Sequence, residues 1–87
     1  MNTVTIKSEH ITSIPSSAFY NCNSLYTFDT NAAITYVGSS AFYNCYRLAN
    51  FDFKDVSYIG NYAFYGNTLL ETDLINDKIE YIGEHAF

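Results

Sequence analysis

The sequence predicts an α/β solenoid, a stack of coils in which each coil holds one strand and one short helix. The dipeptide Ala-Phe begins at residues 18, 41, 63 and 86, so the repeat is 22 or 23 residues long. Each Ala-Phe follows a second repeated block, in which two Ile or Val residues stand three positions apart. A fixed period of this length is typical of solenoids, whose units bury their apolar sides only against neighbouring units.

The segment that begins at each Ala-Phe predicts the short helix. In the second unit its apolar members are Ala41, Phe42, Cys45 and Leu48, and this spacing places them on one face of a helix. Serines precede the segment in the first two units, where a hydroxyl can accept hydrogen bonds from the first N–H groups of a helix.

The strand follows the helix in each unit. Phe51 and Phe53 alternate with polar residues, which suits a strand with one buried face, and residues 56–59 form a second short extended stretch. In the third unit we place Thr72 and Leu74 inward and Asp73 outward, because burying an unpaired carboxylate costs several kcal/mol.

A turn precedes each Ala-Phe, and its glycines are Gly38, Gly60 and Gly83, with Pro15 at the equivalent place in the first unit. Proline fixes φ at about −65°, so a geometry shared by all units does not require a positive φ at this position. We therefore expect glycine here because another part of the backbone passes close by.

The pattern I/V-G-x-x-A-F-x-x-C/N-x-x-L occurs twice in succession, at residues 37–48 and 59–70. Through it, residues 11–87 resemble the BspA-like, or Treponema-type, leucine-rich repeat. The resemblance implies a right-handed coil with one strand per repeat on its concave side. It also implies a secreted or cell-surface protein that serves adhesion to other proteins or cells.

We expect one repeat domain over residues 1–87, in which residues 1–17 form a partial repeat. Further repeats cover residues 18–40, 41–62 and 63–85, and another begins at 86–87. Neither end resembles a capping repeat with a polar outer face. The chain is therefore expected to be a piece of a longer array, or to bury its ends against a partner.

The predicted core is the apolar face that the units share. Its members are Ala18, Phe19, Cys22, Leu25, Ala41, Phe42, Cys45, Leu48, Phe51, Ala63, Phe64 and Leu70. The two cysteines occupy equivalent positions and are both expected to point inward. Asn67 stands at the same place in the third unit, so the position needs no disulfide, and we expect free thiols.

Composition excludes several classes of partner. The net charge is −5 and the 87 residues include only four Lys and Arg, whereas binding to nucleic acid requires clustered basic side chains. No apolar run approaches the roughly 18 residues of a membrane span. We predict no nucleic acid, no membrane insertion and no cofactor.

Acidic residues at equivalent strand positions form the candidate binding site. Asp29, Asp52 and Asp73 are expected to form a column on the exposed, concave strand face, headed by Thr5. The predicted ligand-binding residues are Asp29, Asp52, Asp73, Tyr26, Asn50 and Glu71. Neighbouring like charges repel, so the column suggests a strip for a cation or a basic ligand. The alternative is a set of solvated carboxylates that keep the sheet soluble.

Tyrosines recur at two further positions, in the sets Tyr20, Tyr43 and Tyr65, and Tyr36, Tyr58 and Tyr81. A tyrosine ladder suits half-buried packing, and it suits adhesion where it faces solvent as a continuous strip.

No catalytic or metal site is predicted. The two histidines, His10 and His85, lie near opposite ends of the chain. Asp29 and Asp52 could serve as general acid and base, but the sequence supplies no nucleophile or inserted loop beside them. We therefore expect a non-enzymatic module that binds a protein ligand. The alternative is a structural spacer that self-associates by stacking end to end.

Overall fold

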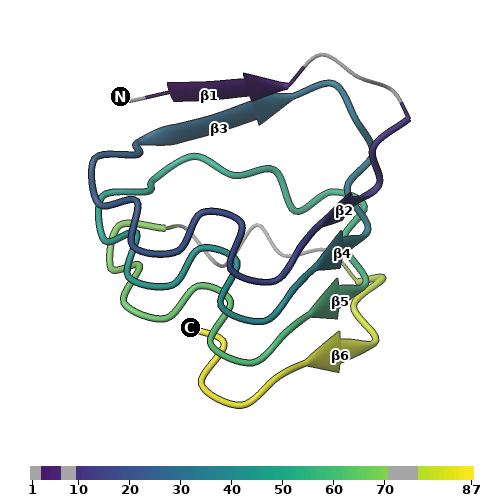
Figure 1. Cartoon of the computed structure of the whole chain (residues 1–87). Coiled ribbons are helices and arrows are strands. Elements are labelled where there is room, and N and C mark those ends of the chain that lie inside the picture. Colours follow the sequence, from purple (N-terminus) through teal and green to yellow (C-terminus); the bar gives the residue numbers. More distant parts are fainter. Residues whose placement is uncertain (1–2, 7–9, 71–76) are drawn as a thin grey trace.

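The computed structural model describes residues 3–6, 10–70 and 77–87. The described residues form six short strands, all in parallel pairings (Figure 1). They are β1 (Thr3–Ile6), β2 (Ser13–Ile14), β3 (Thr27–Thr30), β4 (Tyr36–Val37), β5 (Tyr58–Ile59) and β6 (Tyr81–Ile82). The first coil of the chain carries β1 and β2, the second β3 and β4, the third β5 and the fourth β6.

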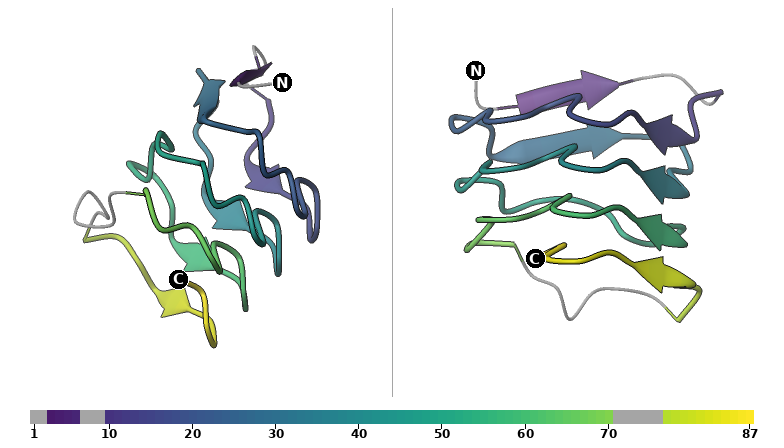
Figure 2. Two further views of the ribbon diagram at one scale, coloured as in Figure 1. Left: turned by 90° about the vertical axis from the view of Figure 1, so that its left-hand side faces the viewer. Right: turned by 60° about the horizontal axis from the view of Figure 1, so that its bottom comes forward.

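Two separate ladders hold the coils together. The larger has the order β2-β4-β5-β6, so the coils lie in sequence order along one side of the molecule (Figure 2). The smaller pairs β1 with β3, and in its register Thr5 stands opposite Asp29. A single bridge between Thr27 and Asn50 continues this ladder into the third coil. The strand expected in every repeat is therefore reduced to one bridge there, and the strand placed around Asp73 lies outside the described residues.

The expected helices are wrong for the part of the chain that the structure describes, because these segments form consecutive turns. Ser40 and Asn44 have φ values of 57° and 59°, in the left-handed region that interrupts a helix. The N–H of Ala41 bonds back to the carbonyl of Gly38 at 3.2 Å, but the next N–H, that of Phe42, donates to Ala63 in the following coil at 2.8 Å.

This alternation continues along the turns. The N–H groups of Ser40, Phe42 and Asn44 all donate to the following coil, while those between them close local turns. The turns thus act as a third ladder between coils, and they pair backbone groups that would otherwise be buried without partners.

Phenylalanine rings form the centre of the core. Phe19, Phe42 and Phe64 stack in one row with centroids 5.2 Å apart and planes within 9° of parallel. Phe51 meets Phe42 edge-on at 5.4 Å and a 71° angle, which is a favourable arrangement for aromatic pairs. The row runs through successive coils, as the repeat period predicts.

Most of the predicted core is buried, and the exceptions lie in the first coil. The buried members are Leu25, Ala41, Phe42, Cys45, Leu48, Phe51, Ala63, Phe64 and Leu70. The prediction is wrong for Ala18 and Cys22, which are exposed, and Phe19 is only half-buried. The equivalent residues of later coils lie against a preceding coil, whereas none of the described residues covers this side of the first coil. The core also includes Ile14, Phe28, Ile34, Val37, Phe53, Val56, Ile59 and Ala86.

The glycines of the repeated turn stand where one coil passes close to the next, as predicted. A Cβ added to Gly60 would lie 2.6 Å from the backbone nitrogen of Ser39. No positive φ is found at Gly38, Gly60 or Gly83. Steric exclusion by the preceding coil, and not backbone conformation, therefore requires glycine here.

Candidate binding groove

An open groove of about 490 Å³ lies beside β3 and the equivalent segment of the third coil. It is lined by Tyr26, Thr27, Phe28, Asp29, Ala49, Asn50, Phe51, Asp52, Phe53 and Leu69. The period-two alternation of an extended chain places Phe28 in the core and Asp29 in solvent. The same alternation in the next coil buries Phe51 and Phe53 and exposes Asp52 between them.

Polar contacts fix the two strand segments relative to each other. Asn50 Nδ2 donates a hydrogen bond to Thr27 Oγ1 at 3.0 Å, and the N–H of Phe28 donates to the carbonyl of Asn50 at 3.0 Å. Asn50 thus connects the coils through both its side chain and its backbone, and it uses its amide group to do so.

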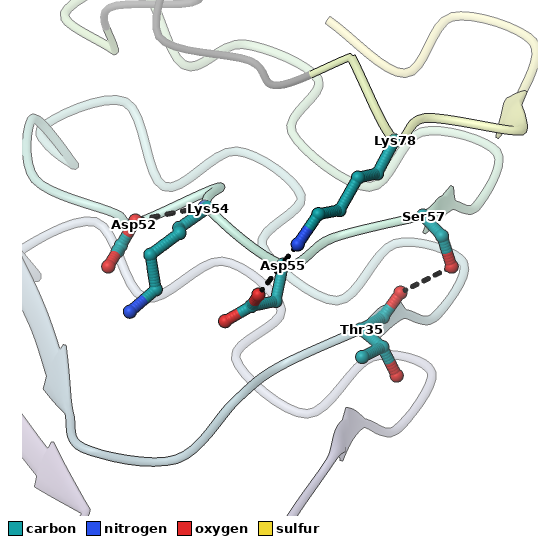
Figure 3. Close-up of polar contacts among 6 residues, drawn as sticks. All are labelled: Thr35, Asp52, Lys54, Asp55, Ser57 and Lys78. Atoms are coloured by element: carbon teal, nitrogen blue, oxygen red, sulfur yellow. Dashed lines mark hydrogen bonds and ion pairs between the residues drawn. The ribbon is translucent and has the colours of Figure 1, made fainter.

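The two carboxylates of the groove are the main source of charge on its surface. Asp52 Oδ1 accepts a hydrogen bond from the backbone N–H of Lys54 at 2.9 Å, which orients this side chain at the end of the extended segment (Figure 3). Asp29 and Asp52 are both exposed, and neither forms an ion pair with another described residue. Among the described residues the groove lining contains no lysine or arginine. Within the described part of the chain, the groove therefore presents two carboxylates and no cationic side chain.

Asp55, which does not line the groove, is in a different situation. Asp55 forms an ion pair with Lys78 of the fourth coil, with 3.3 Å between Oδ1 and Nζ (Figure 3). Ser57 adds another link between coils through its Oγ, which donates to the carbonyl of Thr35 at 3.2 Å (Figure 3). These contacts lie beyond the groove lining and hold coils together.

The structure brings four of the six predicted binding residues together: Tyr26, Asp29, Asn50 and Asp52 all line the groove. The other two, Glu71 and Asp73, lie outside the described residues. Sequence reasoning missed Leu69, which is 53% exposed and lines the groove. The sequence feature that could have identified Leu69 is that it is apolar at a position where the other units have Ser24 and Arg47.

Both tyrosine ladders are present; their outer members are exposed, whereas the middle members, Tyr43 and Tyr58, are half-buried. Tyr36, Tyr58 and Tyr81 stack at 4.4 and 4.8 Å, and Tyr20, Tyr43 and Tyr65 stack at 4.9 and 5.3 Å. Partial burial, together with the neighbouring Tyr36 and Tyr81, raises the pKa of Tyr58. Since the rings lie nearly parallel in each stack, they pack against one another and present mainly their edges and hydroxyl groups.

The cysteine and histidine side chains that could serve a catalytic or metal site do not gather in one place. Cys22 and Cys45 are both free thiols, and burial raises the pKa of Cys45 to about 11. The ring of His85 lies 5.2 Å from that of Tyr62. Within the described ranges, no three His, Cys, Asp or Glu side chains are grouped closely enough to hold a metal ion. The same residues contain no helix with the length and apolarity needed to span a bilayer.

Comparison with protein families agrees with the repeated coils described above. The family model of the BspA type leucine rich repeat region (6 copies) matches residues 1–87. The chain belongs to the BspA-type leucine-rich repeat family. Repeats of the BspA type occur in surface and secreted proteins, and leucine-rich repeats are typically non-enzymatic interaction modules. Searches of curated proteins and of solved structures gave no match.

Proposed function

We propose that this BspA-type repeat region is a protein-binding module of a secreted or cell-surface protein, and that its groove binds a cationic segment of a partner. The observation that carries the proposal is the pair Asp29 and Asp52, two exposed carboxylates in adjacent coils. No lysine or arginine accompanies them among the described residues of the groove lining. Adjacent strands lie about 4.8 Å apart, so the two charges reinforce each other's attraction for a cation.

The rest of the groove supports a peptide as the ligand. Tyr26 is 51% exposed and Leu69 is 53% exposed, so both can contact the apolar stem of a Lys or Arg side chain. Tyrosine is also enriched at protein interfaces, because its ring supplies contact area and its hydroxyl supplies a hydrogen bond. Acidic, aromatic and apolar groups thus converge on one open surface, which suits a basic segment better than a small neutral ligand.

The test uses a defined probe, a fluorescent peptide of alternating Lys and Thr, and measures its binding by anisotropy at low and physiological salt. A peptide of alternating Glu and Thr serves as the control ligand. The double variant Asp29→Asn, Asp52→Asn keeps the shape of both side chains and removes their charge. We expect it to bind the basic peptide about two- to thirtyfold more weakly, because two exposed ion pairs contribute about 0.2 to 1 kcal/mol each.

The matched control is the double variant Glu80→Gln, Glu84→Gln, which removes the same charge from exposed positions that do not line the groove. It should bind the basic peptide within about twofold of the unaltered chain, apart from the screened long-range effect of net charge. Equal loss in both variants would mean that net charge alone attracts the peptide, and the groove would not be the binding site.

A further inference from the structure

Position 15 differs in kind from the equivalent positions Gly38, Gly60 and Gly83. A Cβ added to Gly38 would lie 2.5 Å from the backbone nitrogen of Ser16 and 2.8 Å from the carbonyl carbon of Pro15. Contacts this short between a side-chain carbon and backbone atoms do not occur in folded proteins, so every residue larger than glycine is excluded wherever a coil is stacked in front. The first coil nevertheless carries proline at this place.

Proline also removes a hydrogen bond that the later coils make. The N–H of Gly38 donates to the carbonyl of Ile14 at 2.8 Å, and the N–H of Gly60 donates to the carbonyl of Val37 at 2.8 Å. Pro15 has no N–H to donate. A coil stacked in front of Pro15 would therefore clash with the proline ring. One backbone carbonyl of that coil would also lack its hydrogen-bond donor.

The described residues at the two ends of the stack leave exposed two apolar side chains whose equivalents are buried between coils. Ile82 occupies the place of Ile59 and is 48% exposed, whereas Ile59 is fully buried. At the opposite end Ala18 is exposed, whereas Ala41 at the equivalent place is fully buried against its neighbours. The fourth coil thus presents an apolar surface of the kind that the first coil would cover if one copy of the chain followed another.

We propose that Pro15 closes the N-terminal end of this stack to docking, so that a second copy cannot place its C-terminal end against it in the way one coil packs on the next. The two ends therefore differ in what they accept. Glycine at position 15 would make the contact between copies equivalent to the contacts across Gly38 and Gly60. This property goes beyond the groove and is independent of the ligand proposed for it, and it opposes the alternative of a spacer built by end-to-end stacking.

The test compares the unaltered chain with Pro15→Gly and Pro15→Ala by light scattering over a range of concentrations. Both variants restore the N–H, but only the glycine variant lacks a Cβ. We expect the mean mass of Pro15→Gly to rise continuously with concentration, because a head-to-tail contact does not close on itself. The unaltered chain and Pro15→Ala should show the same mass as each other at every concentration.

A second variant identifies the surface involved. Adding Ile82→Lys to Pro15→Gly places a charge on the C-terminal end and should abolish the increase in mass. Far-ultraviolet circular dichroism and thermal melting establish that each variant is folded.

The proposal would be overturned if Pro15→Gly behaved like the unaltered chain, or if Pro15→Ala associated as strongly as Pro15→Gly. It would also fail if association survived Ile82→Lys. Loss of folding in Pro15→Gly would contradict the equivalence of this turn to that of Gly38.

Discussion

The thiol of Cys45 donates a hydrogen bond to the main-chain carbonyl of Phe19 in the preceding coil, with 3.0 Å between Sγ and O. One coil later, the side-chain amide of Asn67 donates to the carbonyl of Phe42 at the same distance, 3.0 Å. A thiol and an amide share this position because both are small enough for the core and both can donate to the coil in front.

This relationship predicts the effect of changing Cys45. Cys45→Asn keeps a donor and Cys45→Ala removes it, so the alanine variant should be less stable than the asparagine variant by about 1 kcal/mol. Urea unfolding of the two variants measures the difference. An alanine variant at least as stable as the asparagine variant would show that the hydrogen bond does not determine which residues this position accepts.

The same thiol predicts a pH dependence of stability. Burial raises the pKa of Cys45 from 9.0 to about 11, so between these values the unfolded chain loses its thiol proton while the folded chain retains it. The contribution of the Cys45 thiol to the free energy of unfolding is complete below pH 9.0 and is lost as pH rises toward about 11. Tyrosines titrate in the same range, so the measurement is the free energy of unfolding of the unaltered chain minus that of Cys45→Asn. We expect this difference to fall with rising pH, and a constant difference would contradict the raised pKa.

Two glycines predict opposite outcomes of substitution. Gly60→Ala places a Cβ 2.6 Å from the backbone nitrogen of Ser39 and should lower the free energy of unfolding by about 1 to 3 kcal/mol or more. Gly66 has a φ of 85°, and Asn21 and Asn44 occupy the equivalent place with φ near 60°. Gly66→Asn should therefore leave stability within about 1 kcal/mol of the unaltered value. Thermal melting of both variants checks this, and a reversed order would contradict the close packing of coils.

The Phe row predicts a strong contrast between aromatic residues. Phe42 is fully buried and contacts the rings of Phe28, Phe51 and Phe64, so Phe42→Leu should cost about 1 to 3 kcal/mol. Tyr46 is 42% exposed and serves as the control, where leucine should change stability by no more than about 0.5 kcal/mol. Equal effects in chemical denaturation would mean that the row does not form the core.

The sequence predicted the stacking of coils, because a fixed period places equivalent residues one above another whatever the local conformation. It also predicted that Asp29 and Asp52 would share a surface with Tyr26 and Asn50, since the alternation of an extended chain decides which side chains face solvent.

The helices were mispredicted because the apolar spacing from Ala41 to Leu48 fits both a helix and a chain of alternating turns. The deciding signal was the column of Asn21, Asn44 and Gly66, which are residue types that tolerate positive φ. The exposure of Ala18 and Cys22 could not be predicted from the local sequence, because burial at these positions depends on whether another coil packs against the first.

The central claim is that the turns of each coil bond to the next coil and do not close into helices. Scalar couplings transmitted through hydrogen bonds, measured by NMR on isotope-labelled protein, test it at the N–H of Phe42. The structure predicts a coupling from this N–H to the carbonyl carbon of Ala63, across the 2.8 Å bond between coils. A coupling to the carbonyl carbon of Gly38 instead, which is the pairing of an α-helix, would contradict the account.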